Sequence, residues 1–368
     1  QLPMLHRSQM LAKLMEDKKA ICVAGAHGKT TTSSMIALAM ELAKKDPTIV
    51  VGGEIAQIGS NAKSGKSAYL VAEADESDGS FLNLHPWMTV ITNVEEDHLD
   101  HYKDLDNIRN AFRSFVQLPD ENGVAVLNYD CAETRQLAAY AQGKVISYGL
   151  SADAQVRGEN CRQVQGENIV DVYRDNIFLG TLKLHVPGQH NISNALAAVA
   201  VGLEIGMTFE EIASGLKEFG GARRRFQLLG NVQNIQIIDD YAHHPTEIET
   251  TFDSVKRTKH NQNWAIFQPH TYSRTYEHLN EFADVLKNFD NIIIAKIYAA
   301  REDNIYGINE DMLVDLIKKE NKNVQYIEHF EDIEKYILEN VQDNDLIISI
   351  GAGPINKITN NLTKKDCN

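Results

Sequence analysis

The sequence is poor in cysteine, in proline and in long apolar stretches. It holds 4 cysteines and 8 prolines among 368 residues, and no two cysteines have C-x-x-C spacing. This pattern argues against a disulfide scaffold and against a zinc site built from thiolates. No apolar run reaches the ~18 residues that a membrane helix needs, and the N-terminus lacks the layout of a signal peptide. We therefore expect a cytoplasmic protein with no membrane partner.

Basic residues are also scarce relative to acidic ones. The chain has 36 Lys and Arg against 51 Asp and Glu, which gives a net charge of −15. Nucleic-acid binding is not expected of such a surface, and an anionic substrate must be bound by a local basic site. A chain of 368 residues is long enough for two domains with separate cores. Nothing in the sequence indicates an oligomeric state.

The most informative segment is ICVAGAHGKTTT at residues 21–32. An apolar strand runs into a loop with Gly25 and Gly28, and a helix follows that opens with Lys29 and Thr30. Such a loop turns backbone N–H groups toward phosphate oxygens, while the lysine supplies a charge and the threonine a hydroxyl for Mg²⁺. The generic G-x-x-x-x-G-K-[ST] spacing fails, because a valine stands five residues before Gly28. The segment predicts a nucleotide-phosphate site, and an ordinary strand-turn-helix is the alternative.

Strands and helices alternate through the first half of the chain. Short β-rich runs at 21–24, 68–72 and 89–92 are interleaved with helical patterns at 31–43 and 105–115. This alternation predicts an α/β fold with a mostly parallel sheet. In such sheets ligands bind beyond the carboxyl ends of the strands, so the residues after each run are candidates for a site.

The second half repeats this alternation as a separate α/β domain. Between 124 and 186 the pattern turns to shorter β-like pieces, and an Ala-rich helix is predicted over 191–205. Two glycines at 220 and 221 follow a helical pattern, so we place the domain boundary there. The expected domains are residues 1–221 and residues 222–368. Strands of the second domain are predicted at 235–238, 264–267, 292–295 and 346–350.

Acidic residues follow the second predicted strand in the run EADESD, which begins at Glu73. A carboxylate there is a suitable ligand for a Mg²⁺ shared with nucleotide phosphates, although a solvated acidic loop is an equally ordinary interpretation. After the next strand comes His98, which lies beside Asp97. A lone histidine is more often a packed or capping residue than a ligand, so a second metal site there is only one alternative.

Further polar groups occur at predicted strand and helix ends. His190, Asn191 and Asn194 open the Ala-rich helix, where the amides are able to contact a nucleotide or, in the case of Asn191, to cap the helix. In the second half Arg225 follows the boundary, and Arg274 supplies the planar fork that suits a carboxylate. Basic and acidic residues at strand ends in two domains suggest a cleft between them.

Several of these motifs together resemble the Mur ligase family of peptidoglycan synthesis, over essentially the whole chain. The segments that carry the resemblance are GAHGKTT at 25–31, EADESD at 73–78, EEDHLD at 95–100, DDYAHHPTE at 239–247 and FQPHTYSRT at 267–275. The last two segments are similar to those of the members that add alanine. The resemblance implies a central P-loop ATP-binding domain followed by a Rossmann-like, amino-acid-binding C-terminal domain.

The resemblance also implies roles for particular residues. Catalytic roles fall on Lys29, Glu73, His98, Arg225 and Asp240. The expected ATP-binding residues are Gly25, Ala26, His27, Gly28, Lys29, Thr30, Thr31, His190, Asn191, Asn194, Arg225 and Asp240. Mg²⁺ is expected at Thr30, Glu73 and His98, and the substrate at Tyr241, His243, His270 and Arg274.

The implied activity is ATP-dependent addition of L-alanine to UDP-N-acetylmuramate through an acyl phosphate, with ADP and phosphate as products. Two alternatives stay open, namely a ligase that attaches a whole peptide during wall recycling, and a nucleotide-binding fragment without ligase activity. Thr271 stands where some alanine-adding members have arginine, which leaves the amino-acid carboxylate to Arg274. The family's N-terminal module for the UDP portion has no counterpart in this sequence, so we expect a truncated ligase.

Overall fold

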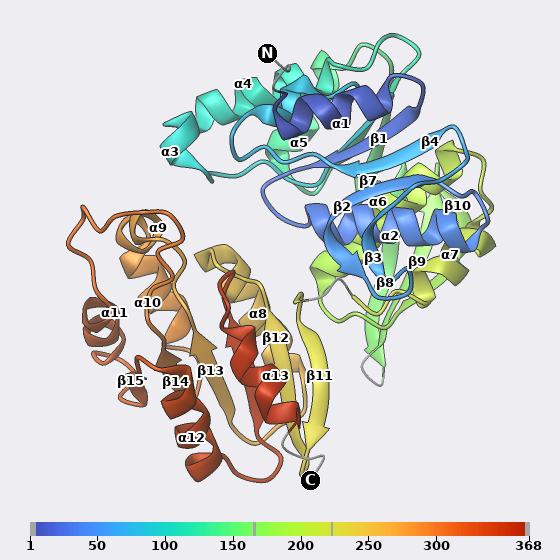
Figure 1. Ribbon diagram of the computed structural model, residues 1–368. Coiled ribbons are helices and arrows are strands. Elements are labelled where there is room, and N and C mark those ends of the chain that lie inside the picture. The colour runs from blue at the N-terminus through green and yellow to red at the C-terminus, as the bar shows by residue number, and fades with distance from the viewer. Residues whose placement is uncertain (1–4, 165–166, 222–223, 365–368) are drawn as a thin grey trace. The chain divides into compact units, whose positions relative to one another are not determined.

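The chain folds as two units, Gln1–Arg223 and Arg224–Asn368, each built around its own β-sheet (Figure 1). The computed structural model describes residues 5–164, 167–221 and 224–364. Among the helices in these ranges, none combines the length and apolar character that a membrane crossing requires.

The first unit contains ten strands and seven α-helices within the described ranges. The strands are β1 (Lys19–Ala24), β2 (Thr48–Ile55), β3 (Ser60–Lys63), β4 (Tyr69–Glu73), β5 (Met88–Ile91), β6 (Val124–Asn128), β7 (Lys144–Gly149), β8 (Val156–Val164), β9 (Glu167–Arg174) and β10 (Ile177–Leu184). The helices are α1 (Arg7–Met15), α2 (Lys29–Leu42), α3 (Leu99–Tyr102), α4 (Leu105–Val116), α5 (Ala132–Gln136), α6 (Gln189–Glu204) and α7 (Phe209–Lys217).

The strands of the first unit form one sheet in the order β10-β9-β8-β7-β6-β5-β1-β4-β2-β3. The pairs from β8 through β2 are parallel, whereas β8-β9-β10 at one end and β2-β3 at the other pair antiparallel. The expected α/β fold with a mostly parallel sheet is therefore confirmed. The β2-β3 hairpin was not predicted, because two glycines interrupt β2 after its apolar start and β3 is polar apart from Ala62.

Both faces of this sheet are covered by helices. Along β1, Ile21 and Val23 pack into a core with α2, α6 and α7, while Ala20, Cys22 and Ala24 pack on the opposite face with α1 and α4. A parallel strand buried on both faces reads as a continuous apolar run, which is why this segment was recognisable from the sequence.

The second unit contains six strands and six α-helices within the described ranges. The strands are β11 (Gln227–Val232), β12 (Ile235–Asp240), β13 (Asn263–Phe267), β14 (Asn291–Ile294), β15 (Val324–Tyr326) and β16 (Leu346–Ile350). The helices are α8 (Pro245–Arg257), α9 (Tyr272–Glu277), α10 (Leu279–Leu286), α11 (Glu310–Ile317), α12 (Phe330–Asn340) and α13 (Asn356–Lys364).

The sheet of the second unit has the order β11-β12-β16-β13-β14-β15, and all pairs except β11-β12 are parallel. One core packs α8, α10 and α11 on the sheet, and a second packs α12 and α13 on the other face. The four strands predicted in this half correspond to β12, β13, β14 and β16. The carboxyl ends of the parallel strands meet at one edge of this sheet, which is where ligand sites of such folds lie.

Candidate active site

The loop between β1 and α2 is held in place by Asn93, which follows β5. Ala26 N donates to Asn93 O at 3.3 Å, and His27 N donates to the Asn93 side-chain oxygen at 2.8 Å. The His27 carbonyl in turn accepts from Thr92 Oγ1 at 2.6 Å and from Asn93 Nδ2 at 3.0 Å. The loop is thus fixed from the neighbouring strand end before any ligand arrives.

Gly25 and Gly28 have no room for a side chain. Gly25 has φ of +141°, and a Cβ there would lie 2.1 Å from Thr92 Oγ1. Gly28 has φ of +82°, and its Cβ would lie 2.7 Å from Asn194 Oδ1. Gly28 also precedes the first residue of α2, so the helix N-terminus opens directly onto the loop. Helix N-termini of this kind are suited to binding phosphate groups.

Lys29 points back into this loop and is fully paired. Its ammonium donates to Gly25 O at 2.7 Å, to Ala26 O at 3.2 Å and to Glu76 Oε1 at 2.7 Å. Burial lowers the Lys29 pKa, but the carboxylates of Glu76, Glu73 and Asp75 together raise it by more, so the net pKa lies above the ordinary value. The lysine is therefore charged at neutral pH and is poised beside the phosphate loop.

Glu73, at the end of β4, forms a hydrogen bond with Thr30, the second residue of α2. Thr30 Oγ1 donates to Glu73 Oε1 at 3.0 Å, and Gly52 N donates to Glu73 Oε2 at 2.8 Å. A threonine hydroxyl and a carboxylate side by side at a phosphate loop are the oxygen ligands that Mg²⁺ takes together with a nucleotide. The structure thus brings two of the side chains predicted for Mg²⁺ into hydrogen-bond contact, and their role as ligands stays a prediction.

His98, the third residue predicted for Mg²⁺, lies beside Asp97 and Glu76 and not beside Glu73. Its Nε2 is 3.5 Å from Asp97 Oδ2 and 3.8 Å from Glu76 Oε1. Glu76 is only 3% exposed, its Oε2 has no hydrogen-bond partner among the residues that the structure describes, and burial raises its pKa against the effect of Lys29. Of the acidic run after β4, this residue is the one that the interior encloses. The solvated-loop interpretation is therefore wrong for Glu76.

The amides at the start of α6 connect that helix to the phosphate loop. Thr32 Oγ1 donates to Asn194 Oδ1 at 3.1 Å, and Asn194 Nδ2 donates to Asn191 Oδ1 at 3.3 Å. Asn191 Nδ2 donates to the Pro187 carbonyl at 2.6 Å, and Gly188 is the residue that precedes the helix, so Asn191 is not its cap. His190 is exposed on the first turn.

Thr31 and His27, two more of the residues expected to bind ATP, also lie in the first unit. Thr31, the second predicted threonine of α2, is 8% exposed. The His27 side chain lies 3.4 Å from Glu95 Oε2.

The oxygen donors of Thr30 and Glu73 suit a Mg²⁺ ion that a nucleotide also binds, rather than a metal ion held by the protein alone. Within residues 5–164, 167–221 and 224–364, no group of three or more His, Cys, Asp or Glu side chains is arranged to hold a metal ion. Mg²⁺ commonly takes one or two carboxylates and completes its shell with substrate phosphates and waters. Thr30 and Glu73 supply such a partial set at the N-terminus of α2, where the helix opens onto the phosphate loop.

In the second unit, Asp240 closes β12 and is buried at 6% exposure. Ala242 N donates to its Oδ1 at 3.1 Å and Thr251 Oγ1 donates to its Oδ2 at 2.8 Å. Burial raises the pKa of Asp240 to about 6, although Arg225 and the Thr251 hydrogen bond act in the opposite direction. A carboxyl with so high a pKa at a strand end is a functional candidate.

Two adjacent arginines precede β11 and have different partners. Arg224 donates to Asp239 Oδ2 at 3.1 Å and to the Gly351 carbonyl at 2.6 Å, contacts that tie the chain to the sheet. Arg225 donates to Glu247 Oε1 at 3.3 Å, and its guanidinium lies 5.5 Å from the ring centre of Tyr241. The Arg224 guanidinium also lies over the Tyr241 ring, at 4.9 Å, so the two arginines share this ring and differ in their carboxylate partners.

His243, His270 and Arg274 gather beside Tyr241 at the ends of β12 and β13. The His243 ring lies 5.5 Å from that of Tyr241 and 5.9 Å from that of His270, centre to centre. Arg274 NH1 lies 3.3 Å from His270 Nδ1. Burial lowers the pKa of His270 to about 4 and that of His243 below its ordinary value, so both rings are neutral at pH 7. The four predicted substrate residues thus form one cluster.

Thr271 shapes the loop that carries Arg274. Its backbone has φ of +68° and ψ of 151°, a conformation that is strained for a β-branched residue. The strain is balanced locally, since Thr271 Oγ1 accepts from Arg274 N at 3.4 Å and lies 3.1 Å from Ser273 Oγ. Thr271 therefore caps α9, the helix that carries Arg274, a role that the sequence did not indicate.

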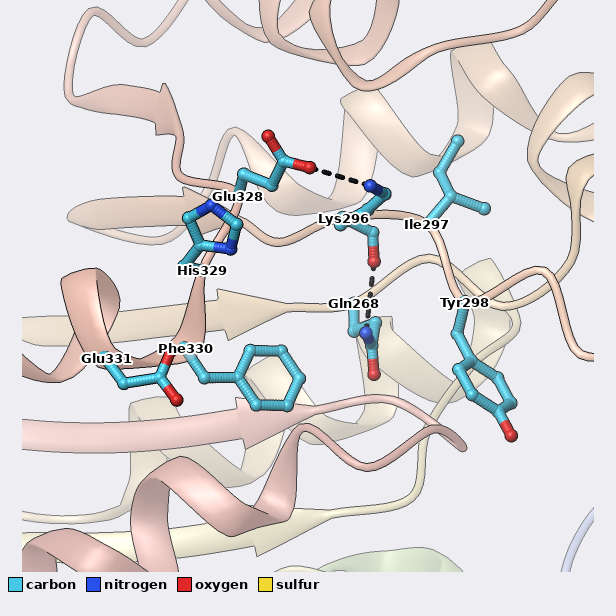
Figure 2. A pocket seen from close by; sticks show the side chains of 8 residues that line it. All are labelled: Gln268, Lys296, Ile297, Tyr298, Glu328, His329, Phe330 and Glu331. Atoms are coloured by element: carbon cyan, nitrogen blue, oxygen red, sulfur yellow. Dashed lines mark hydrogen bonds and ion pairs between the residues drawn. The ribbon is translucent and has the colours of Figure 1, made fainter.

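A pocket of about 330 Å³ lies next to this cluster, at the ends of β13, β14 and β15. Its lining residues are Gln268, Lys296, Ile297, Tyr298, Glu328, His329, Phe330 and Glu331 (Figure 2). Gln268 Nε2 donates to the Lys296 carbonyl at 3.1 Å, and Lys296 Nζ lies 2.7 Å from Glu328 Oε1. The Tyr298 ring is 5.7 Å from that of His270. None of the residues predicted for the site lines this pocket.

The structure gathers the predicted residues into two groups, one at the strand ends of each unit. The residues that sequence reasoning missed are those that hold the predicted ones, namely Thr92, Asn93, Glu76, Thr251 and Glu247. Asn93 and Thr92 stand at a predicted strand end, so that signal was available. Glu247 lies three residues after His244, the spacing of a capping box at a helix start, which was also readable.

Comparison with known proteins shows where such a pair of units occurs. Residues 23–202 match the Mur ligase middle domain and residues 224–353 match the Mur ligase, glutamate ligase domain. The UDP-N-acetylmuramate–L-alanine ligase of Carboxydothermus hydrogenoformans is 43% identical over 364 residues, which are 99% of this chain and 78% of that protein. The same ligase of Pelotomaculum thermopropionicum is 47% identical over 356 residues, 96% of this chain and 77% of that protein.

A solved structure agrees with the sequence comparisons. The crystal structure of UDP-N-acetylmuramate-alanine ligase from Thermotoga maritima superposes with a TM-score of 0.81 at 27% identity, covering 97% of this chain and 77% of that one. The matched segments include the phosphate loop of the first unit and the strand-end cluster of the second. This chain belongs to the Mur ligase family.

Proposed function

We propose that this chain is an ATP-dependent amide-bond ligase that adds L-alanine to UDP-N-acetylmuramate. The observation that carries the proposal is the pairing of Lys29 with Glu76 and of Thr30 with Glu73 at the carboxyl ends of β1 and β4. The relatives at 43% and 47% identity, both UDP-N-acetylmuramate–L-alanine ligases, give the substrates. The reaction belongs to peptidoglycan precursor synthesis in the cytoplasm, where ATP and UDP-linked sugars are available.

The two halves of the chain have separate tasks in this proposal. Residues 1–221 bind ATP through the phosphate loop and the amides of α6, and residues 222–368 bind the amino acid through the cluster around His243. The support is chemical, since an anionic triphosphate needs the N–H groups and the cation of the loop, while an amino-acid carboxylate needs a guanidinium such as that of Arg274.

Lys29 stabilises charge on the phosphates during transfer. The lactyl carboxylate of UDP-N-acetylmuramate attacks the γ-phosphorus of ATP, the bond to the bridging oxygen breaks, and ADP leaves with an acyl phosphate as the other product. Negative charge on the transferred phosphoryl group must be neutralised along this path. Cations that are already in position stabilise such charge strongly in a site with little water. Thr30, Glu73 and His98 would hold Mg²⁺, which supplies further neutralisation of the phosphate oxygens.

The amino acid then reacts in the second half of the reaction. Its neutral amine attacks the acyl carbon, a tetrahedral intermediate forms, phosphate leaves and a proton is lost to give the amide. Arg274 orients the carboxylate of the amino acid, and the neutral His243 and His270 keep its surroundings free of competing positive charge. In addition to this main task, the second half supplies Arg225 and Asp240, which we assign to the nucleotide, and Arg225 acts on the Asp240 carboxyl.

A substrate panel tests the proposal. The chain is incubated with MgATP, UDP-N-acetylmuramate and either L-alanine, glycine, L-serine or a tripeptide that begins with L-alanine, and products are identified by mass spectrometry. We expect the mass of the alanine adduct as the dominant product. A tripeptide adduct without an alanine adduct would instead assign the chain to wall recycling, and ATP binding without any adduct would make it a nucleotide-binding fragment.

A further inference from the structure

One carboxylate in the second unit connects a proposed nucleotide residue to a proposed amino-acid residue. Glu247 Oε1 accepts from Arg225 NH1 at 3.3 Å, and Glu247 Oε2 accepts from His243 N at 2.9 Å. The same Oε2 lies 3.2 Å from Nδ1 of the His243 ring. The Glu247 side chain is 12% exposed, so these contacts form in a largely dry environment.

The neighbours of the His243 ring decide where its proton lies. Nδ1 faces two acceptors, Tyr241 O at 3.0 Å and Glu247 Oε2 at 3.2 Å, so the proton of the neutral ring is on Nδ1. The lone pair is then on Nε2. His270 has the opposite arrangement, because Arg274 can only donate and its NH1 lies 3.3 Å from His270 Nδ1.

We propose that Glu247 is a positioning residue for the ligation, which fixes His243 with Nε2 as a hydrogen-bond acceptor for the amino group of the amino acid and holds Arg225 in the same network. This inference rests on the proposed function. The ligation needs an amine with a free lone pair, so the amino group requires an acceptor nearby rather than a second cation. A histidine whose other nitrogen is tied to a carboxylate meets that need.

The groups that act on the His243 pKa come from several elements, and the Glu247 carboxylate and the hydrogen bond with the Tyr241 carbonyl oppose the two arginines. Burial lowers the His243 pKa, Glu247 raises it, and Arg274 and Arg225 lower it further. His270 is the other ring in contact. Loss of the Glu247 charge therefore lowers the His243 pKa and weakens one of the two acceptors that face Nδ1, the other being the Tyr241 carbonyl.

A purely structural role for Glu247 makes a different prediction. Glu247 is the third residue of α8 and accepts from the backbone N of His244, which precedes the helix, at 3.3 Å. Glutamate and glutamine both serve in this capping position. The substitution Glu247→Gln therefore keeps the cap and removes the charge, which separates the two roles.

The test compares the wild type with Glu247→Gln and with Glu249→Gln, a matched control on an exposed position of the same helix. We expect Glu247→Gln to raise the KM for L-alanine at least tenfold, with the KM for ATP changed less and the urea midpoint unchanged relative to the control. In ¹⁵N NMR spectra of the ligand-free chain, the Nδ1-protonated form of His243 is expected to dominate in the wild type. In Glu247→Gln we expect that form to be less populated and the His243 pKa to be lower.

The outcomes separate this inference from the proposed function. If the wild type ligates alanine and Glu247→Gln matches the control in KM and in the His243 spectrum, the positioning role is overturned and the function stands. If the wild type shows no alanine-dependent turnover, the function fails, and the His243 spectrum alone decides for or against Glu247. Should Glu247→Gln fold poorly, Glu247→Asp keeps the charge on a shorter side chain, and a wild-type KM for alanine in that variant would also contradict the inference.

Discussion

Lys29 and Glu76 form a buried ion pair, with Lys29 Nζ 2.7 Å from Glu76 Oε1 and side-chain exposures of 14% and 4%. A buried pair is stable only when both charges are present, because removal of one partner leaves the other uncompensated. The lysine that would meet the phosphates is therefore also part of the interior of the first unit. Its catalytic and structural contributions need to be measured separately.

The variants Lys29→Met, Glu76→Gln and the double variant separate these contributions. Each single change is expected to lower the free energy of unfolding of the first unit by about 3 kcal/mol, and the double variant is expected to lose less than either one. Urea unfolding at pH 7 measures these differences. Lys29→Met and the double variant should both lack ATP turnover, so recovered stability without recovered activity marks the lysine as catalytic. Additive losses would contradict the pairing.

Gly52 offers a way to move Glu73 without changing it. Gly52 has no positive φ, but a Cβ there would lie 2.5 Å from Glu73 Oε2, whereas a Cβ at Gly230 meets nothing closer than 3.7 Å. We expect Gly52→Ala to displace the carboxylate and to raise the Mg²⁺ concentration for half-maximal ATP turnover about tenfold, which corresponds to about 1.4 kcal/mol. Gly230→Ala serves as the control. Unchanged Mg²⁺ dependence in Gly52→Ala would count against Glu73 as a ligand.

The raised pKa of Asp240 predicts that this carboxyl lowers the stability of the fold above pH 4, although the proposed activity requires it. Its folded-state pKa of about 6 lies above the ordinary 3.8, so the folded protein binds the proton more tightly than the unfolded chain does. The contribution of this group to stability is therefore complete at low pH and is lost as the pH rises through 4 to 6. Asp240→Asn avoids that loss, since Thr251 Oγ1 also has the Glu247 carbonyl at 3.0 Å as an acceptor and can accept from the new amide.

At pH 7 we expect Asp240→Asn to be more stable than the wild type by about 2 kcal/mol, while its activity falls. Chemical denaturation at several pH values measures the difference in unfolding free energy. That difference should grow between pH 4 and pH 6 and stay constant above it. A difference that is already constant from pH 4 upward would show that the carboxyl has an ordinary pKa.

Arg274 tests the binding of the amino acid. Loss of a charge-assisted hydrogen bond to a carboxylate costs about 2 to 3 kcal/mol. We therefore expect Arg274→Gln to raise the KM for L-alanine by about two orders of magnitude with little change in the KM for ATP. Steady-state kinetics measures both constants, and Arg301→Gln on an exposed loop position is the control. An equal rise in both KM values would indicate a general disturbance of the second unit.

The phosphate loop could be predicted from the sequence because its chemistry is local. Gly25, Gly28, Lys29 and Thr30 are contiguous with a strand that is buried on both faces, and such a strand reads as an apolar run. The same holds for the carboxylate of Glu73, which directly ends its strand. These parts of the fold and of the candidate site depend on neighbours in the chain.

What could not be predicted depends on burial and on distant partners. Glu76 and Asp75 are adjacent acids in one loop, yet only Glu76 is enclosed, because Lys29 lies 47 residues earlier and the fold brings the two together. Arg224 and Arg225 are likewise adjacent, and only the structure shows that Arg224 is tied to Asp239 and to the Gly351 carbonyl. Composition and spacing carry no information about such contacts.

The most direct test of the account is phosphate release from MgATP by this chain, at high concentrations of UDP-N-acetylmuramate and with L-alanine added or withheld. We predict that phosphate release rises with L-alanine and is matched, mole for mole, by the alanine adduct of UDP-N-acetylmuramate. Phosphate release that does not depend on L-alanine, or that proceeds without formation of the adduct, would contradict the assignment as an alanine-adding ligase.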